Sequence, residues 1–354
     1  MRHLAAAIIG LWSALAGLTG PGTAPAFEIE SLTRFPAPGG RPAHSLRVIS
    51  NADTALFSPI VLAFQERHPS VEVIYTTASS TQLMQALAEE GAEFDVAISS
   101  AMDLQIKLAN DGFTRPHRSA LTARLPSWAR WRDHVFAFTQ EPATVVISRA
   151  AFAGLEVPRN REDIITLLRA HPERFRGRLG TYDVRTSGLG YLFATQDSRQ
   201  SETFWRLIEV MGGLGARLYC CSSDMIEDVA AGQLALAYNV LGSYAAARSD
   251  LADRIIVIEP EDFTTVMLRS ALIPARARNP ELAGKFIDHL IRLSWERADP
   301  QSYPFPPIGD GDRQAGSGNP ALRPIRLGPG MLVYLDRLKR RRFLRAWEAA
   351  MLRE

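Results

Sequence analysis

Small polar residues recur where an expected strand ends and a helix begins. They fill the segments 50–53, 78–81, 99–100 and 185–188. In parallel sheets such loops share one edge, and the first amide groups of each helix lack partners within it, so this edge favours an anion. Each hydroxyl could instead only cap its helix. The ligand-binding residues expected from these loops are Asn51, Asp53, Ser79, Ser80, Thr81, Ser99, Ser100, Thr186, Ser187 and Gly188.

Four further residues could shape the same site. Arg185 precedes the Thr186–Gly188 turn, and its guanidinium could grip a carboxylate or phosphonate with two hydrogen bonds. Tyr238 and Asn239 end an expected strand and could supply a ring and an amide; the alternative is a buried tyrosine and a turn asparagine. Glu141 lies at an expected hinge, where it could pair with an amino group of the ligand or stay a solvated carboxylate.

The two cysteines, Cys220 and Cys221, are adjacent. A disulfide between neighbours closes a small strained ring, so we expect two free, half-buried thiols, although an exported chain could form the bond. Cysteines without spaced histidines or further cysteines make a poor metal site, and we expect neither a metal nor a cofactor.

The sequence lacks the motifs of common exported enzymes. It has no Gly-x-Ser-x-Gly elbow, no His-Glu-x-x-His zinc motif and no phosphate-binding loop. Its seven histidines are scattered, and none lies in an expected ligand loop. We therefore expect no catalytic residues, although an acidic side chain could still act as a general base. The net charge of +2 gives no reason to expect a nucleic-acid partner.

Residues 1–26 have the pattern of a cleavable signal peptide. A short basic start precedes an apolar run from Leu4 to Leu18, and Ala24-Pro25-Ala26 offers small residues at a cleavage site. The run is shorter than a membrane span, although an uncleaved tether is the alternative. Since no cysteine lies near the cleavage site, we expect an exported, periplasmic and unlipidated protein. The Pro- and Gly-rich residues 27–43 are expected to be a disordered leader.

Alternating strand and helix patterns position the polar loops. Residues 46–50, 71–75 and 94–98 are expected strands, and the helices between them have apolar residues at helical spacing. Ser79 and Gln82 have the spacing of a capping box at the start of the second helix. Repeats of this kind predict right-handed crossovers and a mainly parallel sheet, hence an α/β fold.

Two extended segments, near residues 135–148 and 255–273, link separate sets of these units. If the chain leaves a lobe by the first and returns by the second, the hinge has two strands and can close on a ligand. We therefore predict an α/β clamshell of two lobes, each a mainly parallel sheet flanked by helices. The predicted divisions are a first-lobe segment at 44–140, the second lobe at 141–258, and a return segment of the first lobe with the C-terminal helices at 259–354.

Two stretches resemble extracellular solute-binding proteins of the ferric- and phosphonate-binding type, in the type II periplasmic binding class. Ser45–Tyr75 is similar to their first β-α-β unit, and Ala271–Pro274 followed by Asn279–Asp288 is similar to their return segment. The resemblance covers residues 45–350. Ferric members carry adjacent tyrosines as iron ligands. Because residues 238–244 lack that pair, we expect an organic or phosphonate-like solute rather than ferric iron.

The resemblance implies a monomeric substrate-binding component of an ABC uptake transporter. Such a protein would bind a small, anionic organic solute in the interlobe cleft and partner a permease and an ATPase in the inner membrane. The alternative is an accessory protein that presents its ligand to a membrane histidine kinase; ferric-iron binding and an exported enzyme are the lesser alternatives. The basic run at 339–342 is interpreted as a solvated face, or else as a permease or membrane contact.

Overall fold

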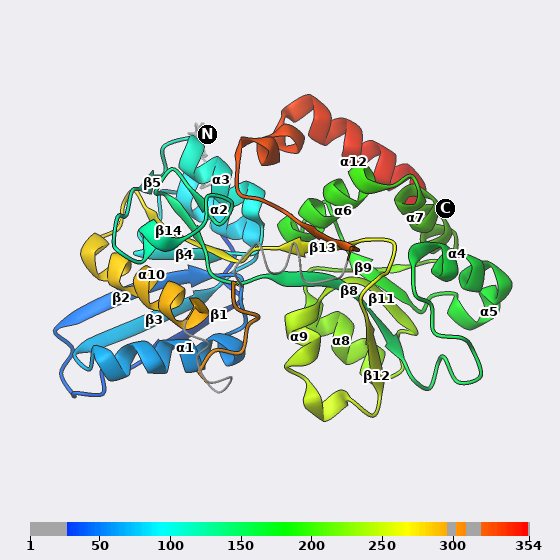
Figure 1. Cartoon of the computed structure of the whole chain (residues 1–354), viewed down its shortest axis with the longest axis horizontal. Coiled ribbons are helices and arrows are strands. Elements are labelled where there is room, and N and C mark those ends of the chain that lie inside the picture. The colour runs from blue at the N-terminus through cyan, green and yellow to red at the C-terminus, as the bar shows by residue number, and fades with distance from the viewer. Residues whose placement is uncertain (1–26, 296–301, 309–319, 353–354) are drawn as a thin grey trace, which may run out of the picture.

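Two β-sheets, each flanked by helices, form the body of the protein in a computed structural model that describes residues 27–295, 302–308 and 320–352 (Figure 1). This arrangement confirms the predicted α/β clamshell of two lobes. The predicted signal peptide, residues 1–26, lies outside the described residues. Within the described part of the chain, no helix is both long enough and apolar enough to cross a membrane.

The first lobe is built on an eight-stranded sheet. Its strands, in spatial order, are β1 (Ser31–Phe35), β3 (Val71–Thr77), β2 (His44–Ser50), β4 (Val96–Ser99), β14 (Ser270–Pro274), β7 (Val135–Ala137) and β6 (Arg130–Trp131), with β5 (Thr114–Arg115) paired to β14. Its helices are α1 (Thr54–Arg67), α2 (Ser80–Ala88), α3 (Met102–Asn110), α10 (Pro280–Trp295) and the 3-10 turn η1 (Thr122–Arg124). As predicted, β2 pairs in parallel with β3 and β4, whereas β14 runs antiparallel to β4.

The packing of α1 illustrates how the sequence positions a loop of this lobe. The apolar face of the helix buries Phe57, Ile60 and Phe64. The Phe57 ring stacks on Tyr75 of β3 with centroids 5.2 Å apart, and the Phe64 ring meets Phe286 of α10 edge-on at 4.9 Å. Since α1 is held between the sheet and α10, the turn from β2 into α1 has a fixed place at the end of β2.

The prediction of a disordered leader at residues 27–43 is wrong. Residues Ser31–Phe35 form β1, which pairs antiparallel with β3 so that Ser31 lies opposite Thr77. Without β1, the edge of β3 would leave its amide and carbonyl groups unpaired. The Pro- and Gly-rich composition belongs to the turn between β1 and β2, and it masked the strand that precedes it.

The second lobe is built on a seven-stranded sheet. Its strands, in spatial order, are β10 (Arg217–Tyr219), β9 (Leu179–Tyr182), β11 (Leu236–Leu241), β8 (Glu141–Ser148), β13 (Thr264–Met267) and β15 (Leu322–Pro324), with β12 (Ile255–Ile258) paired to β8. Its helices are α4 (Arg161–Ala170), α5 (Pro172–Phe175), α6 (Gly188–Gln200), α7 (Thr203–Gly213), α8 (Ser222–Ala230), α9 (Gly242–Ala246), α12 (Arg337–Met351) and the 3-10 turn η2 (Ser249–Leu251). The 3-10 turn η3 (Pro329–Leu335) contacts both α3 of the first lobe and α12. The sheet is mixed rather than mainly parallel as predicted, because β9 runs parallel to its neighbours while β8 runs antiparallel to its own. The first sheet is mixed as well, since β1, β14, β7 and β6 pair antiparallel.

Residues 259–354 were predicted to return to the first lobe, but only part of this segment does so. β13 and β15 belong to the second sheet, and α12 lies over α7 (Figure 1). Phe343 and the fully buried Trp347 of α12 enter the core of the second lobe. Gly212 of α7 permits this approach, because a Cβ there would lie 2.3 Å from the carbonyl oxygen of Ala350. An amphipathic pattern identifies a helix but does not say which lobe covers its apolar face.

The described part of the chain passes between the lobes at more places than the two that were predicted. Residues 138–140 join β7 to β8, within the predicted segment 135–148. Leu268 and Arg269 join β13 to β14; this passage comes late in the predicted segment 255–273 because β12 remains in the second lobe. The third passage, from α10 in the first lobe to β15 in the second, was not predicted.

A buried ion pair ties the first two passages together. Arg269 Nε donates to Glu141 Oε1 at 2.9 Å, and both side chains are fully buried. Thr139 Oγ1 donates to the same oxygen at 2.7 Å and accepts a hydrogen bond from the Arg269 amide at 3.0 Å. Glu141 is therefore paired within the hinge; it is neither the solvated carboxylate nor the ligand-facing one that we expected.

Candidate functional site

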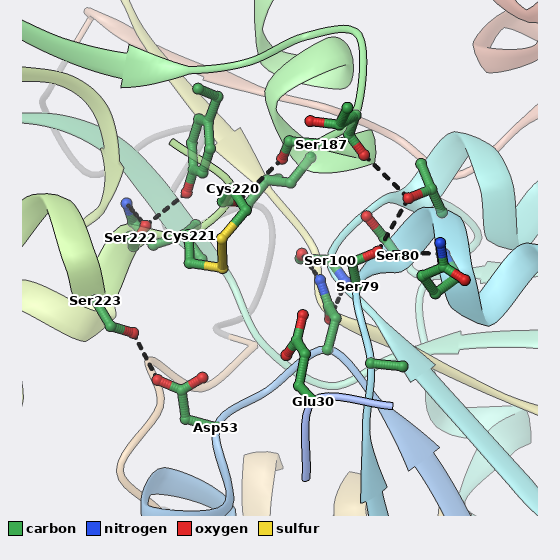
Figure 2. A pocket seen from close by; sticks show the side chains of 18 of the residues that line it. Glu30, Asp53, Ser79, Ser80, Ser100, Ser187, Cys220, Cys221, Ser222 and Ser223 are labelled. Atoms are coloured by element: carbon green, nitrogen blue, oxygen red, sulfur yellow. Dashed lines mark hydrogen bonds between the residues drawn. A yellow bond between two sulfur atoms is a disulfide. The ribbon is translucent and has the colours of Figure 1, made fainter. Parts of the chain in front are cut away.

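A cavity of about 380 Å³ lies between the two lobes, and both lobes contribute to its wall (Figure 2). From the first lobe it is lined by Glu28, Glu30, Asn51, Asp53, Ala78, Ser79, Ser80, Thr81, Gln82 and Ser100. From the second lobe it is lined by Tyr182, Thr186, Ser187, Leu189, Cys220, Cys221, Ser222, Ser223, Leu241 and Tyr244. Most of these residues follow a strand and begin a helix, so the sheet edges that we expected to carry the site face each other here.

Three hydrogen bonds cross the cavity margin from lobe to lobe. Thr81 Oγ1 donates to the carbonyl oxygen of Thr186 at 3.0 Å. Ser223 Oγ donates to Asp53 Oδ2 at 2.6 Å, and the Asp53 amide donates to the Tyr244 hydroxyl at 3.2 Å. The structure therefore presents the two lobes closed on each other, with the cavity between them.

The starts of α2 and α6 form one side of the cavity. Ser79 caps α2 by accepting from the Gln82 amide at 3.2 Å, as predicted, and Ser187 caps α6 by accepting from the Gly190 amide at 3.2 Å. The two helix starts come close together, because a Cβ on Gly188 would lie 2.6 Å from Ser80 Oγ. The first amides of a helix have no partner inside it, so two positive helix ends meet at this side.

A reciprocal pair holds the ends of β2 and β4 together beneath the cavity. Asn51 Nδ2 donates to Ser100 Oγ at 2.6 Å, and the Ser100 amide donates to Asn51 Oδ1 at 3.1 Å. Asn51 and Ser100 line the cavity as predicted, but much of their hydrogen-bonding capacity is already used within the protein.

Carboxylates gather on another side of the cavity. Glu28, Glu30 and Asp53 line it, and Asp224 follows directly after the lining residue Ser223. Burial, together with the carboxylates of Asp53 and Asp224, raises the pKa of Glu30. Burial and the nearby Asp53 likewise raise the pKa of Asp224. The raised pKa values mean that negative charge is crowded here.

Sequence reasoning predicted Asp53 but missed Glu28, Glu30 and Asp224, for two reasons. Glu28 and Glu30 lie just before β1, in the stretch that we interpreted as disordered. The loop before α8 follows β10, a short strand that we did not predict. The available signal was weak: Thr33 and Phe35, both of types that favour strands, are the partly buried residues of β1.

The two cysteines form a disulfide between adjacent residues, so the expectation of two free thiols is wrong. The bond lies in the cavity wall, and Ser187 Oγ donates to the Cys220 carbonyl oxygen at 3.2 Å (Figure 2). Within the described residues, the group that could supply three or more metal ligands is Cys220, Cys221 and Asp224. Because its two sulfur atoms are bonded to each other, this group offers no thiolates to a metal.

Tyrosines and aliphatic side chains complete the wall. The Tyr182 hydroxyl is 2.6 Å from Ser222 Oγ, and burial raises the pKa of the Tyr182 hydroxyl. Burial also raises the pKa of Tyr244 to about 12. These phenols stay neutral at any physiological pH. With Leu189 and Leu241 they give the cavity apolar surface between its polar sides.

The predicted ligand-binding residues divide into two groups. Those that line the cavity are Asn51, Asp53, Ser79, Ser80, Thr81, Ser100, Thr186 and Ser187. Those outside the lining are Ser99, Glu141, Arg185, Gly188, Tyr238 and Asn239. Of the second group, Ser99 is buried and its hydroxyl accepts from the Ala101 amide at 3.1 Å, and Gly188 packs against Ser80 just behind the wall.

Arg185 does not reach the cavity. Its Nε and Nη2 donate to the two carboxylate oxygens of Asp183 at 2.8 and 2.7 Å. The guanidinium group that we expected to bind an anionic ligand is thus already paired with a carboxylate two residues away in the same loop.

Tyr238 and Asn239 belong to a buried network in the second lobe. The Tyr238 hydroxyl and Asn239 Nδ2 both donate to Asp197 Oδ2, at 2.7 and 3.0 Å. Arg161 Nε in turn donates to the Tyr238 hydroxyl at 2.7 Å. The alternative interpretation, a buried tyrosine followed by a turn asparagine, is therefore the correct one, and Asn239 has a positive φ of 63°.

The chain was compared with known proteins. A family model described as bacterial extracellular solute-binding protein matches residues 46–292. A substrate-binding protein of an ABC transporter from Agrobacterium tumefaciens is 34% identical, with a TM-score of 0.85, and the match covers 93% of this chain and 100% of that one. No curated protein matches this chain.

More distant solved structures share the fold. The periplasmic binding protein AfuA from Actinobacillus pleuropneumoniae, bound to fructose-6-phosphate, is 13% identical with a TM-score of 0.69 over 87% of this chain and 99% of that one. Iron-bound HitA from Pseudomonas aeruginosa is 18% identical with a TM-score of 0.63 over 86% and 99%. Identity this low supports the fold alone. The family match and the Agrobacterium relative show that the chain belongs to the bacterial extracellular solute-binding proteins.

Proposed function

We propose that this protein captures a small organic solute between its lobes in the periplasm and that its closed form delivers the solute to the permease and ATPase of an ABC uptake transporter. The observation that carries the proposal is the interlobe cavity, whose wall both lobes share and whose margin Thr81, Asp53 and Ser223 bridge. A solute that touches both lobes binds the closed state better than the open state, so it shifts the population towards closure.

We further propose that the solute carries an acid group. The starts of α2 and α6 support this, since their unpaired amides and the hydroxyls of Ser80 and Thr81 face the cavity or its margin. Helix starts bind carboxylates and phosphonates through such amides without needing an arginine. The pairing of Arg185 with Asp183 removes our original candidate for a charged clamp and leaves the helix starts as the site for the acid.

The oxygen atoms that line the cavity are better suited to an organic solute than to ferric iron. A hard trivalent ion needs several anionic oxygen ligands gathered around one point. Within the described residues, no group of three carboxylates comes close enough to share an ion. Tyr238 is committed to Asp197, and Tyr244 lies in the wall without an adjacent tyrosine.

The test uses the mature chain, residues 27–354, a panel of organic acids and two readouts. Calorimetry is expected to give one binding site, and small-angle scattering to show a more compact particle when the solute is bound. The solute recovered afterwards should be chemically unchanged. Recovery of an altered solute would indicate an enzyme, and binding without compaction would refute capture between the lobes.

A further inference from the structure

The side of the cavity opposite the starts of α2 and α6 is acidic, and it lies at the starts of two other helices, α1 and α8. In Figure 2, Asp53 and Ser223 lie on one side of the cavity, Ser80 and Ser187 on the other, and Glu30 between them. Each carboxylate there carries a full charge when ionised, whereas the helix starts offer only partial positive charge. A solute that is only an anion would therefore meet negative charge across the cavity that the partial charges of α1 and α8 do not fully offset.

Within the described ranges of the chain, no cationic side chain is free to pair with these carboxylates. Among the described residues, no lysine or arginine lines the cavity. The nearby guanidinium groups of Arg269 and Arg185 are already paired, with Glu141 and Asp183. Asp53 uses one oxygen, Oδ2, to accept from Ser223, and no described residue donates to its Oδ1 or to the Glu30 carboxylate. These oxygens face the cavity as acceptors that remain available.

The spacing of the carboxylates favours an organic cation over a metal ion. Glu30, Asp53 and Asp224 influence one another electrostatically, yet they do not form a group that could ligate a single ion. A protonated amine or a guanidinium needs only one or two such acceptors. The disulfide, Tyr244 and Leu189 line the cavity as well and provide apolar surface for a carbon linker.

We propose that the solute is zwitterionic: a small molecule whose acid group sits at the starts of α2 and α6 and whose amine or guanidine group sits between Glu30 and Asp53. This inference rests on the proposed solute-binding function and names the substrate class of the same cavity. The cavity volume of about 380 Å³ limits the solute to the small end of the usual ligand range.

The first experiment separates the two charges of the solute. The mature protein is titrated with ω-amino carboxylates of increasing length, with the same carboxylates lacking the amine, and with the amines lacking the carboxylate. The tightest binding is expected in the amino carboxylate series, by about tenfold or more over either partner, as a charged hydrogen bond would give. A carboxylate without an amine that binds as tightly would overturn the proposal.

A second experiment tests solutes whose carbon skeletons the ω-amino carboxylate series does not include. The protein is equilibrated with a bacterial metabolite extract and freed of unbound material, and the retained compounds are identified by mass spectrometry. A retained compound with both an acid group and a basic nitrogen supports the proposal, and one without a basic nitrogen overturns it. If the protein retains nothing and binds no member of the series, the solute-binding function itself fails.

Two variants then assign the amine to its acceptors. Asp53→Asn keeps an oxygen that can accept from Ser223 while it removes the negative charge. Glu30→Gln removes the negative charge of the neighbouring acceptor. Each variant should weaken binding of the zwitterion by about 10- to 100-fold and should not weaken binding of the matching carboxylate. Glu66→Gln, an exposed change on α1 away from the cavity wall, is the control and should alter neither. Equal weakening of zwitterion and carboxylate would show a structural role and overturn the assignment.

Discussion

Gly188 provides a direct test of whether closure of the lobes is needed for binding. It begins α6 in the second lobe, and a Cβ at this position would approach three side chains of the first lobe, two of them too closely. The distances would be 2.6 Å to Ser80 Oγ and 2.9 Å to Leu104 Cδ1. Both are shorter than ordinary van der Waals contact, so Gly188→Ala should disfavour the closed arrangement and leave each lobe intact.

The magnitude follows from the cost of one extra carbon in a packed contact. Such overpacking costs about 1–3 kcal/mol. Because the added methyl group clashes only when the lobes meet, this cost falls on the closed state alone. If the solute binds only the closed state, its dissociation constant should rise by roughly 5- to 150-fold.

Two further glycines serve as matched controls. Gly190→Ala places a Cβ 2.3 Å from Tyr182 Cβ, within the same lobe, so it should lower the melting temperature of the free protein. Gly213→Ala meets no atom within 4 Å and should change neither stability nor affinity. Calorimetric titration, thermal unfolding and small-angle scattering of the three variants separate the two effects.

The expected pattern for Gly188→Ala is weaker binding, an unchanged melting temperature without solute, and a more open particle in scattering. Unchanged affinity would mean that the solute does not need the contact between α2 and α6. A lower melting temperature like that of Gly190→Ala would mean that the clash acts within one lobe.

Three further outcomes follow from the same structure. Glu141→Gln should lower the free energy of unfolding by about 3–5 kcal/mol in urea titrations, because it leaves Arg269 buried without its counter-charge; a loss too small to resolve would contradict the hinge role. Arg185→Ala should leave solute affinity unchanged in calorimetry, since the side chain lies outside the cavity wall; weaker binding would return it to the site. Because their pKa values are raised, Glu30 and Asp224 take up protons at a higher pH than ordinary carboxyl groups do, so affinity for an amine-bearing solute should begin to decrease at that higher pH while affinity for a purely acidic one should not; in calorimetry across pH, an affinity for the amine-bearing solute that stayed level there would contradict the placement of the amine.

Local pattern was sufficient for much of the fold and part of the site. The apolar spacing of α1 and the alternation in β3 depend on residues close in sequence, so both elements were predicted. The cap Ser79 was predicted for the same reason, and for Ser187 capping was the alternative to ligand binding, because a cap bonds within its own helix turn. Since β2 runs parallel to β3 and β4, and β9 runs parallel to β10 and β11, the loops after these strands share an edge in each lobe, which brought eight predicted residues to the cavity wall.

Partners distant in sequence decided the rest. Glu141 meets Arg269 across 128 residues, and Tyr238 meets Asp197 across 41, so no local pattern could show that both are paired inside the protein. Trp347 could have covered either lobe, because an amphipathic helix shows an apolar face but not its partner. The charge of the cavity was likewise a tertiary property. The sequence determined which loops could hold a solute, but only the pairing of β1 with β3 and the closure of α8 over Asp53 brought the carboxylates together in the wall.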